Sequence, residues 1–410
     1  MFSEFDTNID AMSPNRMTPF LPESESEFLE DLARDVLSRS SVLSGMLHPD
    51  SQIGVVELIR LINSYYSNLI EGHSTHPIEI ERAMKADYAG DPAKRNLQRE
   101  SLAHIQCQRA IEDRLGQVPD LDPSDPEILA WVHAMFYMEL PDELKWVENE
   151  KTGERIPVIG GQFRHRDVEV GRHLPPEHNS LPLLLERFHS TYRRGSQHGV
   201  KPIVAAAAAH HRLAWIHPFL DGNGRVARLY TDASLRILLP GYGLWNVSRG
   251  LARNKDRYMD ALAGADSPRR GDLDGRGNLS NAGLQNFCEF FLRICLDQVE
   301  YMTTMLRLDA LLGRIQGYVN LRVNKIITFP GHPALKPEAA KMLQAVLLRG
   351  EMTRGDVAEA AGSARKGRDI LAQLVSEGLL VSNMPKGPVR FAFPTHIATY
   401  LFPELYPMGA

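Results

Sequence analysis

Residues 202–216, PIVAAAAAHHRLAWI, constrain the fold most strongly, because they predict a helix with almost no polar face. A helix that is apolar all round is stable only where other elements cover every side of it. We therefore expect this helix at the centre of a domain, surrounded by further helices. It leads directly into the stretch from His217 to Arg228, HPFLDGNGRVAR.

Helical spacing of apolar residues recurs along most of the chain and predicts a mainly α-helical fold. One helix is expected from Ser26, and a second from Val55 to Gly72, where the glycine can end it. Another starts at Ser180, with Pro182 suited to its first turn. Further helices are expected over 81–86, 95–115, 126–140 and 287–315, and around Tyr258.

The helical pattern is interrupted twice. From Lys151 to Pro176, glycines and alternating apolar residues predict a short β-hairpin or extended flap. From Thr328, the stretch TFPGHPALKP marks a boundary. The sequence thus predicts four parts: a flexible arm over 1–25, an N-terminal helical region over 26–150, a core with the flap over 151–327, and a winged-helix domain over 335–410.

Composition and charge exclude several classes of protein. The net charge of −5 argues against a nucleic-acid coat protein but allows a local basic patch. The three cysteines are too few and too widely spaced for a disulfide framework, so we expect a reducing compartment. The N-terminus lacks the basic and apolar regions of a signal peptide, and no apolar run reaches membrane-spanning length. We expect a cytoplasmic protein without membrane contact.

The stretch after the central helix combines residue types that suit chemistry on a nucleotide. The Gly-Asn-Gly segment 222–224 precedes a helix, so backbone N–H groups at the helix start can bind an anion. Arg225 and Arg228 are three residues apart and can lie on one face of that helix, which suits a polyphosphate. The alternative without a function is a Gly-rich turn followed by a solvated arginine face. We favour the interpretation as a phosphate-binding site.

Two further residues of this stretch fit reaction chemistry. A carboxylate at Asp221 would repel phosphate unless a divalent cation lies between them, and Mg²⁺ prefers a few carboxylates together with phosphate oxygens. His217, held by the rigid Pro218, can act as a general base near neutral pH. A hydrolytic zinc or iron site that includes His210 and His211 is the alternative. Adjacent residues point about 100° apart on a helix, so we favour a structural role for these two.

The stretch resembles the signature of the Fic family, HPFx(D/E)GNGRxxR, and matches it at every fixed position. The resemblance implies transfer of AMP from ATP to a hydroxyl of a target protein, with release of pyrophosphate. By this resemblance, His217 corresponds to the base that deprotonates the hydroxyl and Asp221 to the Mg²⁺ ligand. The nucleotide-binding residues that it implies are Gly222, Asn223, Gly224, Arg225 and Arg228.

A second short motif lies upstream, at the end of the helix predicted over 55–72. An acid at a helix C-terminus is electrostatically unfavourable and would benefit from an external arginine. Ser67, Glu71 and Gly72 resemble the Fic inhibitory motif, (S/T)xxxE(G/N). The resemblance implies that Glu71 pairs with Arg228 and blocks productive placement of the ATP γ-phosphate. The alternative is a solvated surface glutamate.

The flap and the nucleoside end carry weaker resemblances. The flap, with Arg164, Val168 and Val170, is similar to the family region where an extended target segment pairs through main-chain hydrogen bonds. An ordinary stabilising hairpin is the alternative. Tyr258 is similar to the residue that borders the adenine pocket. Many relatives carry an asparagine where this chain has Asp266, which is a departure from the family pattern.

The predicted winged helix has basic residues near the start of its third helix, Arg365, Lys366 and Arg368, and two more, Lys386 and Arg390, at its wing. This layout is typical of a DNA-reading helix, yet acidic residues dilute the charge. A protein-interaction or dimerisation module is the favoured interpretation, with DNA binding and a homodimer both left open.

The sequence therefore predicts an autoinhibited protein adenylyltransferase that uses ATP and Mg²⁺ on a hydroxyl-bearing target protein, which can be the chain itself. Two alternatives stay open: a de-AMPylating hydrolase in which Glu71 orients a water, and a DNA-binding regulator. The target, the type of residue modified and a different donor, such as another nucleotide or a phosphocholine-type donor, also stay open.

Overall fold

The structure, a computed structural model, describes residues 14–23, 27–148, 153–171, 173–329 and 331–407. The described chain is mainly helical and carries two small antiparallel sheets, so the predicted fold class is confirmed. None of the described helices is long and apolar enough to cross a membrane.

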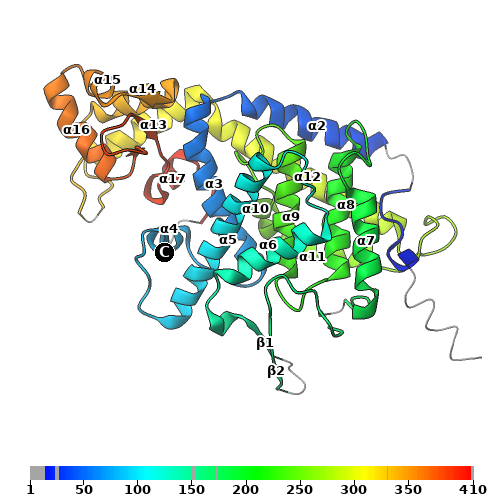
Figure 1. Cartoon of the computed structure of the whole chain (residues 1–410). Coiled ribbons are helices and arrows are strands. Elements are labelled where there is room, and N and C mark those ends of the chain that lie inside the picture. Colours follow the sequence, from blue (N-terminus) through cyan, green and yellow to red (C-terminus); the bar gives the residue numbers. More distant parts are fainter. Residues whose placement is uncertain (1–13, 24–26, 149–152, 172, 330, 408–410) are drawn as a thin grey trace, which may run out of the picture.

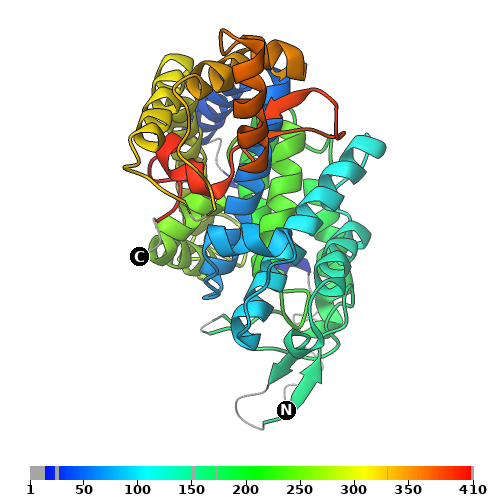
Figure 2. The same cartoon turned by 90° about the vertical axis from the view of Figure 1, so that its left-hand side faces the viewer.

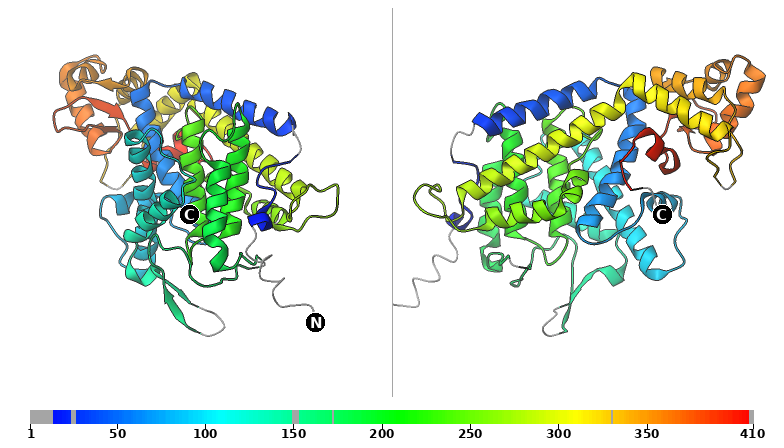
Figure 3. Two further views of the ribbon diagram at one scale, coloured as in Figure 1. Left: turned by 45° about the vertical axis from the view of Figure 1, so that its right-hand side comes forward. Right: turned by 180° about the vertical axis from the view of Figure 1, so that it is seen from behind.

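The predicted central helix is α8 (Lys201–Ile216), and it is buried among other helices. It packs against α9 (Asn223–Leu238), α7 (Leu181–Tyr192), α12 (Asn281–Leu306) and α2 (Glu27–Ser44). Helix α2 crosses one end of the α8–α9 pair, and α12, which packs along α2, runs diagonally behind the pair in the view of Figure 1 (Figures 1 and 3). Ala207, Ala208 and Ala209 are fully buried, and their small side chains allow close helix packing. The core position predicted for this helix is confirmed.

A second group of helices lies on the other side of α9: α3 (Pro49–Ile70), α4 (Pro77–Met84), α5 (Pro92–Gln117) and α6 (Pro126–Met138). Each begins with a proline, which suits the first turn because its missing N–H has no partner in the helix. Helix α3 begins at Pro49 rather than at the expected Val55, and the His48 imidazole caps it by accepting from the Asp50 N–H. It ends where expected, since Gly72 has φ +91° and Glu71 is the C-cap residue.

The hairpin lies earlier in the chain than its glycines predicted. Its strands are β1 (Trp146–Glu148) and β2 (Arg155–Pro157), with Val147 opposite Ile156. The first strand therefore precedes Lys151, and residues 149–152 lie outside the described chain. The hairpin projects from the body, as Figures 1 and 2 show. After β2 the chain runs without a further strand to α7, with one isolated bridge between Val170 and His173 among its described residues.

The described part of the N-terminal segment differs from the flexible arm expected over 1–25; residues 1–13 and 24–25 lie outside the described chain. Met17 and Phe20 are buried, next to the short 3₁₀ helix η1 (Pro14–Met17). The buried guanidinium of Arg212 donates to the Pro19 carbonyl (2.7 Å), which fixes this segment against α8. Composition could not reveal this contact, because its partner lies far along the chain.

The remaining helices of the body follow α9. They are α10 (Ser248–Arg253), α11 (Lys255–Asp266), α12 and α13 (Leu308–Val323). Two short 3₁₀ turns lie earlier in the chain, before α7: η2 (Asp142–Leu144) and η3 (His178–Ser180). The helical stretch expected over 287–315 is broken at Arg307, whose ψ of 120° is not helical. The chain continues as α13 in a new direction (Figure 1).

The C-terminal part gathers at one end of the molecule (Figure 1). Its elements are α14 (Ala339–Arg349), β3 (Glu351–Met352), α15 (Arg354–Glu359), α16 (Ala364–Ser376), β4 (Leu380–Val381), β5 (Val389–Phe391) and α17 (Thr395–Leu401). The strands form one antiparallel sheet in the order β3-β5-β4, so a third strand joins the two that were expected. This part packs on α3, where the Ser51 hydroxyl donates to the Leu347 carbonyl (2.7 Å).

Candidate active site

The backbone at His217 turns sharply to begin the loop between α8 and α9. His217 has φ 51° and ψ 59°, the left-handed conformation that non-glycine residues seldom adopt. Arg164 stabilises this turn from the flap: its Nε donates to the His217 carbonyl (2.8 Å) and its backbone N–H to the Pro218 carbonyl (2.9 Å). Strain of this kind persists only where surrounding contacts hold it, and it is common at functional sites.

Asn223 gives the loop its closed shape. Its amide Nδ2 donates to the Phe219 carbonyl (2.9 Å), and its Oδ1 accepts from the Phe219 N–H (2.9 Å). Gly222, with φ +77°, precedes α9, and a Cβ there would lie 3.0 Å from the Tyr137 ring. The Asn223 side chain is thus used within the loop, and the backbone N–H groups at the start of α9 are left as the anion-binding part of segment 222–224.

Asp221 is held from two directions. Its Oδ2 accepts from the Tyr137 hydroxyl (2.5 Å) and from Arg225 Nη2 (3.2 Å). Burial raises the pKa of this carboxyl, but Arg225 and the Tyr137 hydrogen bond outweigh burial, so the pKa lies below its ordinary value. Asp221 is therefore ionised at neutral pH, and its side chain is 43% exposed.

His133 supports the same loop from α6. Its Nδ1 accepts from the Gly161 N–H (2.8 Å), so Nε2 carries the proton and donates to the Asp221 carbonyl (3.2 Å). Its ring stacks on Phe219 with 4.0 Å between the ring centroids. Sequence reasoning missed both His133 and Tyr137. The signal was two polar rings four residues apart on an otherwise apolar helix, which places them on one face.

Arg228 is buried and contacts the end of α3. Its Nη2 donates to Glu71 Oε1 (2.5 Å) and to the Ser67 carbonyl (3.0 Å), and its Nε donates to the Ser67 hydroxyl (2.9 Å). The structure thus brings together the two motifs that were singled out far apart in the sequence. Burial raises the pKa of Glu71, but Arg228 and Arg225 more than offset burial, so that the pKa lies below its ordinary value.

The Glu71 carboxylate also lies at the start of α9. A Cβ built on Gly224 would be 2.3 Å from Glu71 Oε1 and 3.2 Å from Arg228 Nη1. Position 224 therefore accepts only glycine while Glu71 is in place. A helix N-terminus favours an anion. The carboxylate of Glu71 therefore lies close to Gly224, in the first turn of α9.

Arg225 is fixed by a residue that sequence reasoning missed. Its Nη1 donates to Glu100, a carboxylate of α5 that is 1% exposed, and its guanidinium lies over the Phe136 ring. Glu100 also contacts His73 Nδ1 (2.7 Å). The available signal was an acid at helical spacing from the buried residues Ala103 and Cys107 of the same helix.

His217 is half-buried beside this cluster. Burial, helped by the nearby His173 and Arg164, lowers the pKa of its imidazole to about 4, although Asp221 acts in the opposite direction. The ring is therefore neutral at pH 7 and able to accept a proton.

The residues expected near the nucleoside end make contacts within the protein. Tyr258 is buried, and its hydroxyl contacts His210 Nε2 (2.7 Å), while its place beside the adenine pocket stays a prediction. Asp266 pairs with His173 (3.2 Å) and His211 (3.0 Å), so it ties the flap to α8 and α11. His210 and His211 are fully buried with separate partners, as expected for structural histidines.

The three flap residues differ in how far their side chains are exposed. Arg164 is buried, and its guanidinium also donates to the Pro176 and Arg166 carbonyls. Val168 is half-buried, and Val170 is 39% exposed. Main-chain pairing of this flap with a target segment stays a prediction.

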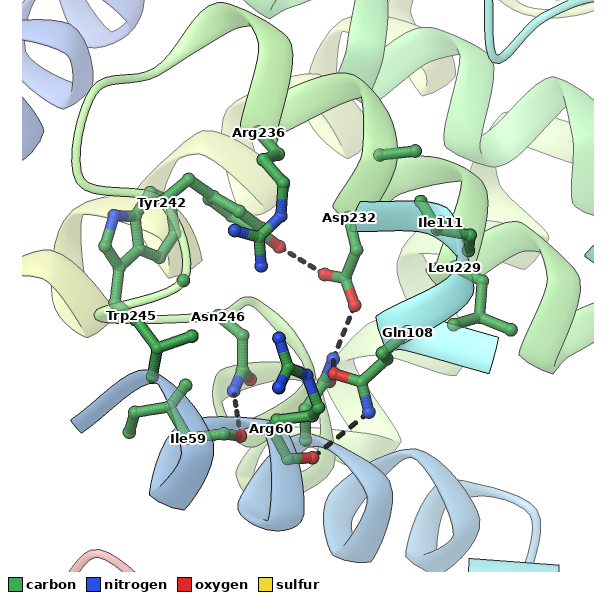
Figure 4. Close-up of a pocket in the computed structure, with 14 residues that line it drawn as sticks. Ile59, Arg60, Gln108, Ile111, Leu229, Asp232, Arg236, Tyr242, Trp245 and Asn246 are labelled. Atoms are coloured by element: carbon green, nitrogen blue, oxygen red, sulfur yellow. Dashed lines mark hydrogen bonds between the residues drawn. The ribbon is translucent and has the colours of Figure 1, made fainter. Parts of the chain in front are cut away.

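A second polar contact joins α3 to α9, one helical turn beyond Arg228 (Figure 4). Asp232 accepts from Asn63 Nδ2 (2.5 Å) and from the Tyr242 hydroxyl. Burial raises the pKa of Asp232. The adjoining cavity is about 20 Å³, which is room for a water molecule but not for a nucleotide. This cluster therefore fastens the two helices together and is not a ligand site.

Comparison with known proteins agrees with this geometry. Residues 123–235 match the model of the Fic/DOC family, a range that includes His217 and Arg228 but neither Glu71 nor the C-terminal part. The chain thus carries a Fic/DOC family domain.

Two curated relatives are both named protein adenylyltransferase Fic. One, from Drosophila mojavensis, is 34% identical over 123 residues, which cover 30% of this chain and 24% of the relative. The other, from Drosophila grimshawi, is 43% identical over 83 residues, which cover 20% of this chain and 17% of the relative. The matched stretches span about a quarter or less of the relatives' length.

Solved structures extend the likeness in fold. A Fic family protein from Desulfovibrio desulfuricans G20 superposes with a TM-score of 0.53 at 19% identity, over 91% of this chain and 98% of that chain. Fic-1 from C. elegans superposes with a TM-score of 0.52 at 15% identity, over 68% of this chain and 73% of that one. At these identities the likeness concerns the fold.

Proposed function

We propose that this chain is a protein adenylyltransferase that transfers AMP from ATP to a protein hydroxyl and is held inactive by Glu71. One observation supports the proposal above the others: Asp221, Arg225 and Arg228 gather at the start of α9, in the loop and helix that follow His217, and the Glu71 carboxylate lies against Gly224 and pairs with Arg228. The names of the Drosophila relatives support the reaction type.

In the proposed reaction the target hydroxyl oxygen bonds to the α-phosphorus, the bond to pyrophosphate breaks, and the hydroxyl proton passes to His217. Burial keeps His217 neutral and ready to accept that proton. The negative charge of bound phosphates would raise its pKa toward neutrality, where a general base is most effective. Positioning and charge neutralisation by Arg225, Arg228 and the start of α9 supply most of the remaining rate.

Asp221 fits the role of a Mg²⁺ ligand. It is ionised, partly exposed and close to the start of α9, and Mg²⁺ prefers one or two carboxylates combined with phosphate oxygens. Within the described ranges, no group of three or more His, Cys, Asp or Glu side chains could hold a metal alone. The ion would therefore share its ligands with the nucleotide and neutralise phosphate charge when bound.

Changing Asp221 to Ala should weaken binding of Mg²⁺-ATP by more than about tenfold, because a metal ligand contributes at least as much as the outer residues that orient it. Binding of metal-free ATP should change much less, since loss of the carboxylate also removes a repulsion. Calorimetric titrations with and without Mg²⁺ measure both. Tyr137→Phe, which keeps the carboxylate, is the matched control. Equal losses with and without Mg²⁺ would make Asp221 a turn residue.

Glu71 is proposed to inhibit AMP transfer by occupying groups that would otherwise bind the phosphates of ATP. It takes Arg228 away from the nucleotide and fills the anion position over Gly224. Productive ATP binding then requires the end of α3 to move or its carboxylate to turn away. The experiment that tests the whole proposal is incubation of Glu71→Gly protein with labelled ATP and a cell lysate, followed by mass spectrometry of the products. Transfer of label from the α-phosphate supports the proposal, and absence of modified protein contradicts it.

The ionised Glu71 also supports hydrolytic removal of AMP from a modified protein as a second candidate. A carboxylate at this position could orient a water molecule for attack on an AMP-modified protein. Loss of AMP from a modified target with the unchanged protein, and not with Glu71→Gly, distinguishes the hydrolase from the transferase.

We further infer that the C-terminal part is a winged helix that serves protein interaction or dimerisation. The support is its element order, helix–strand–helix–helix–strand–strand, with one three-stranded antiparallel sheet. Lys366, near the start of α16, contacts Glu338, which reduces the positive charge offered to DNA. A salt-dependent DNA shift assay tests the alternative of DNA binding.

A further inference from the structure

Glu100 is a single buried carboxylate with two cationic partners from different parts of the chain. Its Oε1 accepts from Arg225 Nη1, on α9. Its Oε2 contacts His73 Nδ1 (2.7 Å), just beyond the end of α3. The side chain is 1% exposed, so it has little access to competing water.

His73 is rigidly connected to Glu71. The His73 N–H donates to the Asn68 carbonyl (2.9 Å), and the Gly72 N–H donates to the Leu69 carbonyl (3.1 Å). These bonds close the C-terminus of α3. A contact that fixes the position of His73 therefore also restricts the position of Glu71, which pairs with Arg228.

We propose that Glu100 is a positioning residue that fixes Arg225 and, through His73, holds the end of α3 against the catalytic loop. The inference rests on the proposed function, because it assigns effects on ATP binding and on release of Glu71. The contact between Glu100 and His73 would then hold the end of α3 in place together with the contact between Glu71 and Arg228.

The effect on Arg225 follows from its surroundings. Its guanidinium lies over Phe136 and is held between Glu100 and Asp221, which fixes its plane. Without the charge of Glu100, Arg225 would be a buried cation with Asp221 as its one remaining charged contact among the described residues. A guanidinium with a fixed plane binds phosphate in a defined geometry, and a loosened one does not.

The effect of His73 depends on pH. The charged groups that face it are Glu100 on α5, Arg225 on α9 and Glu71 at the end of α3. The hydrogen bond to Glu100 raises the pKa of His73, although burial and Arg225 oppose it. The protonated form therefore favours the closed arrangement at pH values below its ordinary pKa, and this contribution is lost as pH rises through the raised value.

Changing His73 to Ala should increase auto-modification with labelled ATP about two- to five-fold at pH 6, the effect expected for a partly exposed ion pair. At pH 8 the gain should shrink, because wild-type His73 has then lost most of its charge. His198→Ala, which removes a different exposed histidine, should keep the wild-type profile. In the Glu71→Gly background, His73→Ala should add nothing, since the contact between Glu100 and His73 acts through Glu71. Equal labelling by His73→Ala and wild type at both pH values would overturn the role of His73.

The role of Glu100 is tested by Glu100→Gln in the Glu71→Gly background. The KM for Mg²⁺-ATP should rise about tenfold or more, as expected for loss of a charge-assisted contact, while kcat falls less. Thermal melts accompany the assay because Glu100 is buried. An unchanged KM in folded protein would overturn the positioning of Arg225.

An NMR titration of His73 decides the matter independently of catalysis. The pKa of its imidazole should be raised in the otherwise unchanged protein and return toward its ordinary value in Glu100→Gln. If no variant transfers AMP, the proposed function fails, and this titration still shows whether Glu100 holds His73. An ordinary pKa of His73 in the unchanged protein would overturn the inference. This measurement needs no variant, so it tests the inference even if Glu100→Gln does not fold.

Discussion

His217→Ala should bind Mg²⁺-ATP almost normally and transfer AMP about 10²–10⁴-fold more slowly, the usual effect of removing a general base. Arg225 is held by Glu100 and Asp221, and Arg228 by Glu71 and Ser67, so these phosphate-binding groups should survive removal of the His217 side chain. The comparison is made in the Glu71→Gly background, where transfer is high enough to measure a large loss. Initial rates with labelled ATP and calorimetric ATP titrations give the two readouts.

The backbone at this position requires a matched variant. His217 has φ 51°, and a left-handed conformation costs alanine roughly 1 kcal/mol, whereas asparagine tolerates it better. His217→Asn therefore removes the base while keeping the turn. The base assignment predicts equal losses of transfer for both variants. Recovery of near-normal transfer in His217→Asn would show that the turn, rather than proton transfer, was lost in His217→Ala.

The centre of the fold could be predicted because its signals are local. An all-apolar helix must be covered, and that argument placed α8 correctly. The glycine at position 72 could be predicted to end α3, because a left-handed residue is the usual helix stop. Periodicity did not find the break at Arg307, since the apolar spacing continues across it while the backbone changes direction.

The candidate site was only partly predictable, because several of its contacts come from distant segments. The residue types of the motif indicated its chemistry, and an acid at the helix end predicted an arginine partner for Glu71. Glu100 carries only a weak signal, its helical spacing from buried residues, since a single acid on a helix is usually solvated. Arg164 was assigned to the flap, and its sequence position did not reveal that its guanidinium donates to the His217 and Pro176 carbonyls. The direction of a long side chain is decided by tertiary packing, which residue order does not encode.

Glu71→Gly should raise auto-modification about 10- to 100-fold above wild type, which is the effect of removing one charge-assisted contact that competes with the substrate. The change frees Arg228 Nη2 and clears the space over Gly224, both of which the Glu71 carboxylate takes in this structure. The low pKa of Glu71 means that inhibition should persist throughout the neutral range and weaken only in acid. Labelling with ATP that carries the label on its α-phosphate measures the gain.

Arg228→Ala separates inhibition from catalysis. It breaks the same ion pair but also removes the nucleotide contact, so it should not activate. The double variant should behave like Arg228→Ala, because Glu71 acts through a residue that is no longer present. A double variant as active as Glu71→Gly would show that Arg228 is dispensable and that Glu71 inhibits through the start of α9 alone.

Controls for folding decide how a negative result is interpreted. Glycine at the C-cap position of α3 costs at most about 1 kcal/mol, and Glu71→Gln keeps the side-chain volume without the charge. Since the Asn63–Asp232 contact holds α3 to α9 independently, the helix should stay docked in both variants. Thermal melts and ATP titrations are therefore run on both. If Glu71→Gly is folded and binds ATP but labels no more than wild type, Glu71 is not an inhibitor. Its carboxylate at the start of α9 is then better explained as the group that orients water for hydrolytic removal of AMP.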